Sequence, residues 1–278
     1  MVTSPRLPEF FVVGSARSGT TSLRWYLLRH PQLFLPRMME PRYFAFAGDT
    51  MEYCGPMDQL LRDKVVTCLE DYTRLYNNCG DDQRAGDVSP AYLCSSQAAG
   101  LMRDLTPEAR IIAILRHPVE RAFSSFRLER LDGVEPEAAF DRALALENAR
   151  ATAGWAYVWR YRERGLYAKH LRRYYDNFPH ERIRVYLYDD WKNSRGVHLL
   201  ADVLSFLGVS PIRPPSRIKH LNSSHSRRFG AAGVAEPILQ NSVAERLLDT
   251  YQKDFDELET MIGRDLSHWR SWPPAQAV

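Results

Sequence analysis

The stretch of sequence that decides the fold reads Phe10-Phe11-Val12-Val13-Gly14-Ser15-Ala16-Arg17-Ser18-Gly19-Thr20-Thr21-Ser22. Its four apolar residues predict a buried strand, its two glycines bound a loop, and the amphipathic segment that follows predicts a helix. A turn of this kind directs several backbone N–H groups to one point at the positive end of a helix. The stretch therefore predicts a site for a phosphate-like anion.

The glycine spacing of this loop, G-x-x-x-x-G, matches that of a nucleotide-triphosphate loop, but the residue after the second glycine does not. A Walker loop has a lysine there, which reaches the β- and γ-phosphates of the nucleotide. This chain has Thr20 at that place, and its positive charge lies inside the loop as Arg17. We therefore expect a loop that holds a phosphate-like group without the lysine of ATP and GTP enzymes.

The size, composition and charge of the chain bound its class. With 278 residues, 45% of them hydrophobic, the chain suits one large α/β domain with a sizeable core. A net charge of +3 argues against a general nucleic-acid binder, which carries a concentrated basic excess. The first strand follows the N-terminus almost at once, and no apolar run reaches the ~20 residues of a membrane span. We expect a cytoplasmic protein without membrane insertion.

The sequence offers little support for a metal or a structural disulfide. Its four cysteines lack the C-x-x-C spacing of zinc and redox sites. They are Cys54, Cys68, Cys79 and Cys94. We expect ordinary thiols, and one disulfide stays open. The chain has no H-E-x-x-H pattern for zinc and no G-x-S-x-G pattern for a serine hydrolase.

Strand and helix patterns alternate along the chain, which favours a parallel sheet with helices on both faces in a single domain over 1–278. We expect strands at 10–13, 111–115 and 183–187, with a short apolar piece at 33–35. We expect helices from the first loop to about His30, from Pro118, over 137–149, over 197–207 and along the apolar stripe of 247–258. Residues 48–86 predict irregular structure and short helices, as an insertion or lid, and residues 211–233 predict a polar loop.

Two further motifs are candidates for anion binding. Arg116 follows the apolar strand 111–115, and ligands of doubly wound sheets collect at the carboxyl ends of the strands. Ser124 comes about two helical turns later, so that the pair would grip a second phosphate. A late loop contains Arg227, Arg228 and Gly230, which suit phosphate binding and closure over a ligand. A solvated basic loop is the alternative there.

Two carboxylates are candidates for proton transfer. Glu40 lies between arginines and aromatics in Glu-Pro-Arg-Tyr-Phe, where it would act as a general base or form an ion pair with Arg37 or Arg42. Asp87, in Gly-Asp-Val-Ser-Pro-Ala-Tyr, would be a base, an orienting group or a turn aspartate. The aromatic and arginine-rich segment 155–178 would form an acceptor cleft, with core packing as the alternative.

Two of these segments together resemble the sulfotransferases that use 3′-phosphoadenosine 5′-phosphosulfate (PAPS). They are Val13-Gly14-Ser15-Ala16-Arg17-Ser18-Gly19-Thr20-Thr21 and Leu115-Arg116-His117-Pro118-Val119-Glu120-Arg121-Ala122-Phe123-Ser124, in that order and about a hundred residues apart. The likeness is strongest to the heparan-sulfate and other carbohydrate enzymes and their bacterial relatives. It implies a P-loop-like parallel sheet, PAPS as donor, 3′,5′-bisphosphoadenosine (PAP) as product, and no metal.

Carried over residue by residue, the resemblance assigns roles to the motifs. The N–H groups of the first loop would hold the 5′-phosphate together with Ser18, Gly19, Thr20, Thr21 and Ser22. Arg17 matches the lysine of many members, over the sulfuryl group. Arg116 and Ser124 match the pair that binds the 3′-phosphate, and Glu40 matches the general base. The segment with Arg227, Arg228 and Gly230 resembles the loop that closes on the cofactor.

The sequence departs from the family pattern at two places. Arg17 replaces the lysine, and because guanidinium does not lose its proton in proteins, Arg17 would act by electrostatics alone. Val88 stands where the family motif Glu-Lys-Thr-Pro-Ala-Tyr has a lysine. A glycosaminoglycan acceptor is therefore disfavoured.

We expect a small-molecule, glycolipid or natural-product acceptor, with a hydroxyl as nucleophile and an amine as second choice. The acceptor contacts would be Asp87, Tyr92 and Trp159. The alternatives are an atypical P-loop kinase or NTPase, which lacks its lysine here, and an inactive nucleotide-binding scaffold. The oligomeric state stays open.

Overall fold

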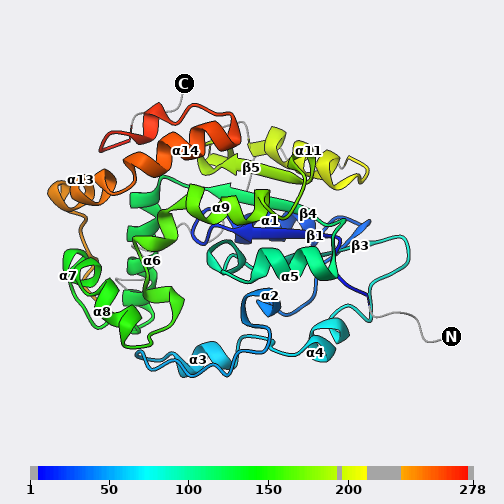
Figure 1. Ribbon diagram of the computed structural model, residues 1–278, viewed down its shortest axis with the longest axis horizontal. Helices are drawn as coiled ribbons and strands as arrows, with labels where there is room; N and C mark the ends of the chain where they lie inside the picture. The colour runs from blue at the N-terminus through cyan, green and yellow to red at the C-terminus, as the bar shows by residue number, and fades with distance from the viewer. Residues whose placement is uncertain (1–5, 193–195, 212–232, 275–278) are drawn as a thin grey trace. The chain divides into compact units, whose positions relative to one another are not determined.

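The computed structural model describes residues 6–192, 196–211 and 233–274 (Figure 1). Its sheet has five parallel strands in the order β2-β3-β1-β4-β5. The strands are β1 (Phe10–Gly14), β2 (Leu33–Phe34), β3 (Arg84–Val88), β4 (Arg110–Leu115) and β5 (Ile183–Leu187). The predicted strands are confirmed, as is the parallel α/β fold. The short helices expected in 48–86 are confirmed at 59–62 and 69–74, but the end of this segment is not irregular, because β3 begins there.

The chain divides into two compact units, which are described separately. The first consists of the described parts of Met1–Thr50, Lys64–Leu115 and His170–Leu221, and it contains the sheet. The second consists of the described parts of Met51–Asp63, Arg116–Lys169 and Asn222–Val278. A single functional domain over 1–278 stays a prediction.

Helices of the first unit cover both faces of the sheet. They are α1 (Thr20–Leu27), α2 (Tyr43–Phe46), α4 (Leu69–Arg74), α5 (Ala98–Leu105), α10 (Tyr188–Lys192) and α11 (Gly196–Leu207), with the single turns η1 (Tyr92–Cys94) and η4 (His180–Arg182). α9 (Tyr167–Tyr175) begins in the second unit and ends in the first. α1 ends at Leu27, so the observed helix is shorter than the predicted one, which was expected to reach about His30.

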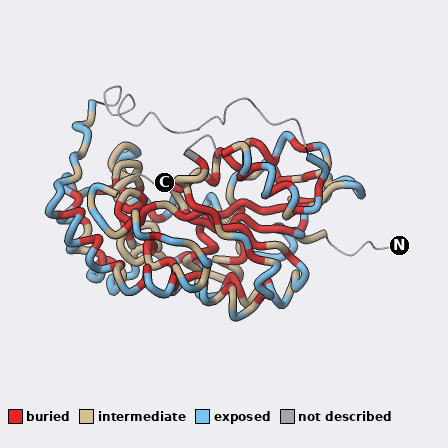
Figure 2. Tube along the Cα trace, turned by 90° about the horizontal axis from the view of Figure 1, so that it is seen from above, coloured by how far each residue is buried: buried red, intermediate tan, exposed pale blue. Residues whose placement is uncertain are grey.

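Side chains of β1 alternate between the two faces, as the pleat of a strand requires. Val12 packs in one buried cluster with Leu27 of α1 and Val203 of α11. Phe11 faces the other way, with its ring edge-on to Phe44 of α2 at 5.0 Å between centroids. β1 is buried at every position, and Figure 2 shows buried segments through the middle of the molecule. The sheet therefore has a core on each face, which holds its carboxyl ends in place.

The second unit is helical in its described residues. Its helices are α3 (Gln59–Arg62), α6 (Pro118–Leu131), α7 (Phe140–Ala145), α8 (Glu147–Thr152), α13 (Asn241–Asp249) and α14 (Gln252–Ile262), with single turns η2 (Tyr157–Trp159), η3 (Glu163–Gly165) and η5 (Ser267–Trp269). The helix expected over 137–149 is wrong as one element, because it is divided at Leu146. The stripe 247–258 likewise spans two helices. Thr250 lies at that break, and its hydroxyl donates to the Leu247 carbonyl, a local bond that competes with the helix ladder.

Two properties of the described residues bear on the expectations from composition. All four cysteines are free thiols. Within the described ranges, none of the helices combines the length and the apolar character that crossing a bilayer needs.

Candidate active site

The glycine-bounded loop leads from β1 into α1, as the sequence predicts. Ser15 donates its backbone N–H to the Ile114 carbonyl of β4 at 2.7 Å, which fixes the start of the loop beside the sheet. Gly14 is packed so closely that a Cβ there would lie 2.7 Å from the Cβ of Leu93. Gly19, at the N-cap of α1, has φ +91°, a conformation that only glycine adopts without steric cost. The turn is therefore rigid, and its helix end is positive.

The side chains of the loop divide into internal and outward groups. The hydroxyls of Ser15 and Ser18 lie 2.6 Å apart and brace the turn from within. Ser18, Thr20 and Ser22 are buried, whereas Arg17 and Thr21 are partly exposed. Arg17 has a left-handed backbone, with φ +70°. These features fit an anion held by backbone N–H groups with one guanidinium beside it.

Glu40 lies in the first unit and is paired with Arg42. The Arg42 guanidinium donates to Glu40 Oε2 through Nη2 at 2.5 Å and through Nε at 3.2 Å. Both side chains are about one-fifth exposed, at 23% for Glu40 and 18% for Arg42. No hydrogen bond reaches Glu40 Oε1 from the part of the chain that the structure describes. Arg42 thus holds one oxygen, and the other is available to accept a proton.

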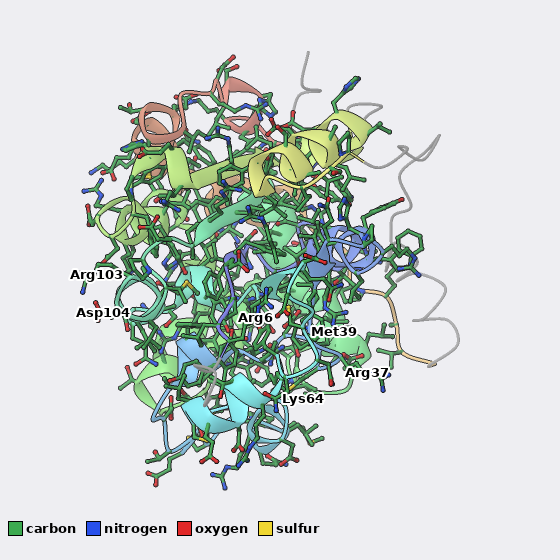
Figure 3. The ribbon with its side chains drawn as sticks, turned by 90° about the vertical axis from the view of Figure 1, so that its right-hand side faces the viewer. Arg6, Arg37, Met39, Lys64, Arg103 and Asp104 are labelled. Atoms are coloured by element: carbon green, nitrogen blue, oxygen red, sulfur yellow. The ribbon has the colours of Figure 1, made fainter. Side chains whose placement is uncertain are left out.

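The loop around Glu40 is anchored to the sheet. The Arg42 N–H donates to Ser89 Oγ at 3.1 Å, and this hydroxyl donates to Asp87 Oδ1 at 2.6 Å. Arg24 of α1 donates to the Pro36 carbonyl at 2.6 Å. Arg37 and Met39, just before Glu40, lie at the surface (Figure 3). Glu40 therefore lies between exposed residues of the loop and Arg42, which is connected through Ser89 to Asp87 of β3.

Asp87 is the buried centre of this network. It is 0% exposed, and its Oδ2 accepts hydrogen bonds at 2.7 Å from both Tyr72 and Tyr92. Burial raises the pKa of Asp87, and the nearby charge of Glu40 adds to that increase, although the three hydroxyl donors oppose it. Burial and the charge of Asp87 raise the pKa of both tyrosines well above the ordinary value. Asp87 and Tyr92 are hydrogen-bonded to each other in the interior, and acceptor contact through them stays a prediction.

The raised pKa of Asp87 predicts a pH-dependent contribution to stability. Because the folded protein holds this proton more tightly than the unfolded chain, the contribution is fully present below pH 3.8 and is lost as pH rises through the folded-state pKa. We expect the free energy of unfolding of the wild type, relative to Asp87→Asn, to fall over that range. Urea unfolding of both proteins at a series of pH values measures the difference. A difference that does not change with pH would contradict this prediction.

Arg116 and Ser124 belong to the second unit. Arg116 follows directly on Leu115, the last residue of β4, and its Nε donates to Glu120 Oε2 at 2.9 Å. Its carbonyl accepts a hydrogen bond from the Tyr167 hydroxyl at 2.7 Å. Ser124 is partly buried on α6, which begins with Pro118. The Arg-His-Pro segment is thus held by side chains of its own unit.

Trp159 also lies in the second unit, and it is 1% exposed. Its Nε1 donates to Asp58 Oδ1 at 2.8 Å, so its polar atom already has a partner. Contact between Trp159 and an acceptor stays a prediction. Arg227, Arg228 and Gly230 lie outside the described residues. Over 6–192, 196–211 and 233–274, no group of three or more His, Cys, Asp or Glu side chains is placed to hold a metal.

Sequence reasoning missed Ser89, Tyr72 and Arg24, and it named Arg42 only as an ion-pair alternative. Arg24 was a detectable signal, because it is the one charged residue in α1. Burial lowers the pKa of Arg24, and the charges of Asp87 and Glu40 oppose that effect. Tyr72 carried no signal, since it lies in the segment that lacks clear periodicity.

Known proteins resemble this chain in both sequence and fold. A profile described as the sulfotransferase family matches residues 8–175, more than half of the chain. A sulfotransferase of Alicyclobacillus acidocaldarius superposes with a TM-score of 0.83 at 31% identity, covering 96% of this chain and 100% of its own. Heparan sulfate glucosamine 3-O-sulfotransferase 6 of Mus musculus is 27% identical, over 94% of this chain and 73% of its own.

Other curated relatives are much longer than this chain. The membrane-associated sulfotransferase kil1 of Dictyostelium discoideum is 31% identical over 43% of this chain and 22% of its own length. The bifunctional heparan sulfate N-deacetylase/N-sulfotransferase 3 of Mus musculus is 26% identical over 82% of this chain and 24% of its own. The chain thus spans about a quarter or less of these two relatives. From the profile match, the near-complete structural correspondence and the loop geometry, it follows that this chain belongs to the sulfotransferase family.

Proposed function

We propose that this chain transfers the sulfuryl group of PAPS to an acceptor hydroxyl, with an amine as the second choice. The single observation that carries the proposal is the Glu40 carboxylate, held through Oε2 by Arg42 while Oε1 takes no hydrogen bond from any described residue. Membership of the sulfotransferase family and the rigid anion loop support it.

The residues of this chain divide the work of binding the donor. The loop N–H groups after Ser15, together with the residues 18–22, bind the 5′-phosphate, and Arg17 places its positive charge beside the sulfuryl oxygens. Arg116 and Ser124 bind the 3′-phosphate of the same nucleotide. Bound PAPS supplies an activated sulfuryl group on a good leaving phosphate. Arg227, Arg228 and Gly230 would add contacts that the described residues do not include.

Glu40 performs the proton transfer. Its Oε1 takes the proton of the acceptor hydroxyl while the acceptor oxygen bonds to sulfur and the bond from sulfur to the 5′-phosphate oxygen breaks. Arg17 and the loop N–H groups stabilise the charge that develops on the departing phosphate. The catalysis is mainly positioning and electrostatics, as in phosphoryl transfer. The products are the sulfated acceptor and PAP.

Arg42 is proposed as a positioning residue for this base. Arg42→Met is expected to lower kcat about tenfold, which corresponds to about 1.4 kcal/mol, with little change in KM for PAPS. The reason is that Glu40 loses both hydrogen bonds that orient Oε2, while the residues that bind PAPS are unchanged. Arg42→Lys should restore part of kcat because one donor returns. Steady-state kinetics with PAPS measures this, and equal loss in both variants would contradict the positioning role.

Calorimetry and a transfer assay test the function. We expect tight binding of PAP and PAPS and weak binding of ATP-Mg. Transfer of labelled sulfate to one of a panel of phenols, lipids and sugars, followed by mass spectrometry, identifies the acceptor. We expect EDTA to leave transfer unchanged, because Arg17 supplies positive charge at the reacting group. Tight binding of ATP-Mg alone would support a kinase. If no nucleotide binds tightly, the result would support an inactive scaffold. The small-molecule, glycolipid or natural-product acceptor and the cytoplasmic location stay predictions.

A further inference from the structure

A cavity of about 340 Å³ lies in the first unit among the amino-terminal ends of the strands. Its lining includes Arg84 and Arg110, the first residues of β3 and β4, and Arg182, which directly precedes β5. In a parallel sheet, the first residues of the strands gather at the edge opposite to the carboxyl ends. This cavity is therefore separate from the glycine-bounded loop and from Glu40, which follow the carboxyl ends of β1 and β2.

The arginines outnumber the acids that line this cavity. Glu9 Oε2 lies 3.3 Å from Arg84 Nη1, and Glu108 is paired with Arg182. Arg110 makes no ion pair and no side-chain hydrogen bond with any residue in the described part of the chain, and its Nη1 is buried without a partner. A buried donor of this kind is costly to leave unsatisfied. One cation of the cavity thus has no ion pair and no side-chain hydrogen bond of its own among the described residues.

The guanidinium of Arg110 is also held in a fixed place. It lies 5.8 Å from the ring centroid of Phe206 on α11, and the Arg184 guanidinium lies 4.9 Å from the same ring. Gly208 follows α11 with φ +67°, and a Cβ there would lie 2.9 Å from Arg110 Nη1. Burial lowers the pKa of Arg110, the charges of Arg84 and Arg182 lower it further, and the charge of Glu9 opposes these effects in part. Packing therefore holds this cation near two other cations that repel it.

We propose that this cavity binds a tetrahedral oxyanion, a phosphate or sulfate group, between Arg84, Arg110 and Arg182. Guanidinium groups donate forked hydrogen bonds to such oxygens, and a bound dianion relieves the repulsion among the three cations. A cavity of about 340 Å³ has room for the anion alone or for a small molecule that carries it. The site is independent of the PAPS-binding residues.

Titration calorimetry at constant ionic strength tests this site, with sodium sulfate, sodium phosphate and glycerol 1-phosphate as probes and chloride as the reference. We expect saturable binding to the wild type and at least tenfold weaker binding to Arg110→Gln. If Arg110→Gln folds poorly, Arg182→Gln replaces it as the test variant, because the Arg182 side chain is 29% exposed. It should also weaken anion binding. Arg103→Gln is the matched control, because Arg103 is exposed and paired with Asp104 (Figure 3), and it should bind like wild type.

The glycine-bounded loop also attracts anions, so Arg17→Gln separates the two sites. Binding that persists in Arg17→Gln and weakens in Arg110→Gln supports the cavity, whichever nucleotide the loop prefers. Binding lost in Arg17→Gln and kept in both cavity variants would overturn the proposal, as would no saturable binding to the wild type. If glycerol 1-phosphate binds and the inorganic anions do not, the ligand of the cavity is a phosphorylated small molecule. Binding of all three probes indicates that the ligand is a free anion.

Discussion

Glu40→Gln is expected to lower kcat for sulfuryl transfer by roughly 10² to 10⁴, with little change in the affinity for PAPS. The amide keeps the size of the side chain and one acceptor oxygen for Arg42, but it cannot take the proton of the acceptor hydroxyl. The binding residues of the donor lie elsewhere, in the loop 14–22 and at Arg116. The loss should therefore fall on the chemical step.

Single-turnover kinetics with labelled PAPS measures this step directly, and calorimetry with PAP measures binding in the same preparation. Glu70→Gln is a matched control, because the parent side chain is 76% exposed on α4 and makes a surface ion pair with Arg74. That variant should transfer sulfate at the wild-type rate. Near-normal turnover in Glu40→Gln would refute the base assignment while leaving the donor site unaffected.

Arg116→Ala is expected to weaken the binding of PAP by about ten- to several hundredfold. One hydrogen bond to a charged group contributes about 1.5–3 kcal/mol, and a guanidinium reaches a phosphate with one or two of them. Glu120, which accepts from Arg116 Nε at 2.9 Å, would orient the side chain for this contact. The variant also leaves Glu120 without that partner, so folding must be checked by thermal unfolding.

The choice of nucleotide isolates the 3′-phosphate. Adenosine 5′-phosphate lacks this group, so its affinity should be the same for wild type and Arg116→Ala, whereas the affinity for PAP should fall. Arg142→Ala removes the same charge from an exposed position of the second unit and should bind both nucleotides like wild type. Unchanged affinity of Arg116→Ala for PAP would discredit the 3′-phosphate site.

Runs of apolar residues made three strands of the sheet predictable. β1, β4 and β5 each contain an uninterrupted or nearly uninterrupted apolar segment, whereas β3 reads Arg-Ala-Gly-Asp-Val. β3 is nevertheless buried, because it pairs with β1 on one side and β2 on the other. A Cβ at Gly86 would lie 2.0 Å from the Phe10 ring, so the glycine makes room for an aromatic of the adjacent strand. Periodicity along one segment contains no information on such a contact.

The residue types of the candidate site were also predictable, but their partners were not. From the residues alone, Glu40 and Asp87 were both candidates for proton transfer, and only the family resemblance favoured Glu40. In the structure Asp87 is 0% exposed beneath two tyrosine hydroxyls, whereas Glu40 is 23% exposed and paired with Arg42. Burial and hydrogen bonding, which depend on residues far apart in the chain, make one carboxylate structural and leave the other able to accept a proton.

By itself, the sequence determined the glycine-bounded turn from β1 into α1, because its glycines and the helix that follows are local properties of 14–27. That this turn binds an anion stays a prediction. The sequence also determined the parallel sheet, because alternating strands and helices leave few other arrangements. Only the tertiary structure decided which of Arg37 and Arg42 pairs with Glu40, and which arginine of the strand ends lacks an ion-pair partner among the described residues. Those outcomes depend on the packing of β1, β3 and β4 against one another, and such packing is a property of the whole fold.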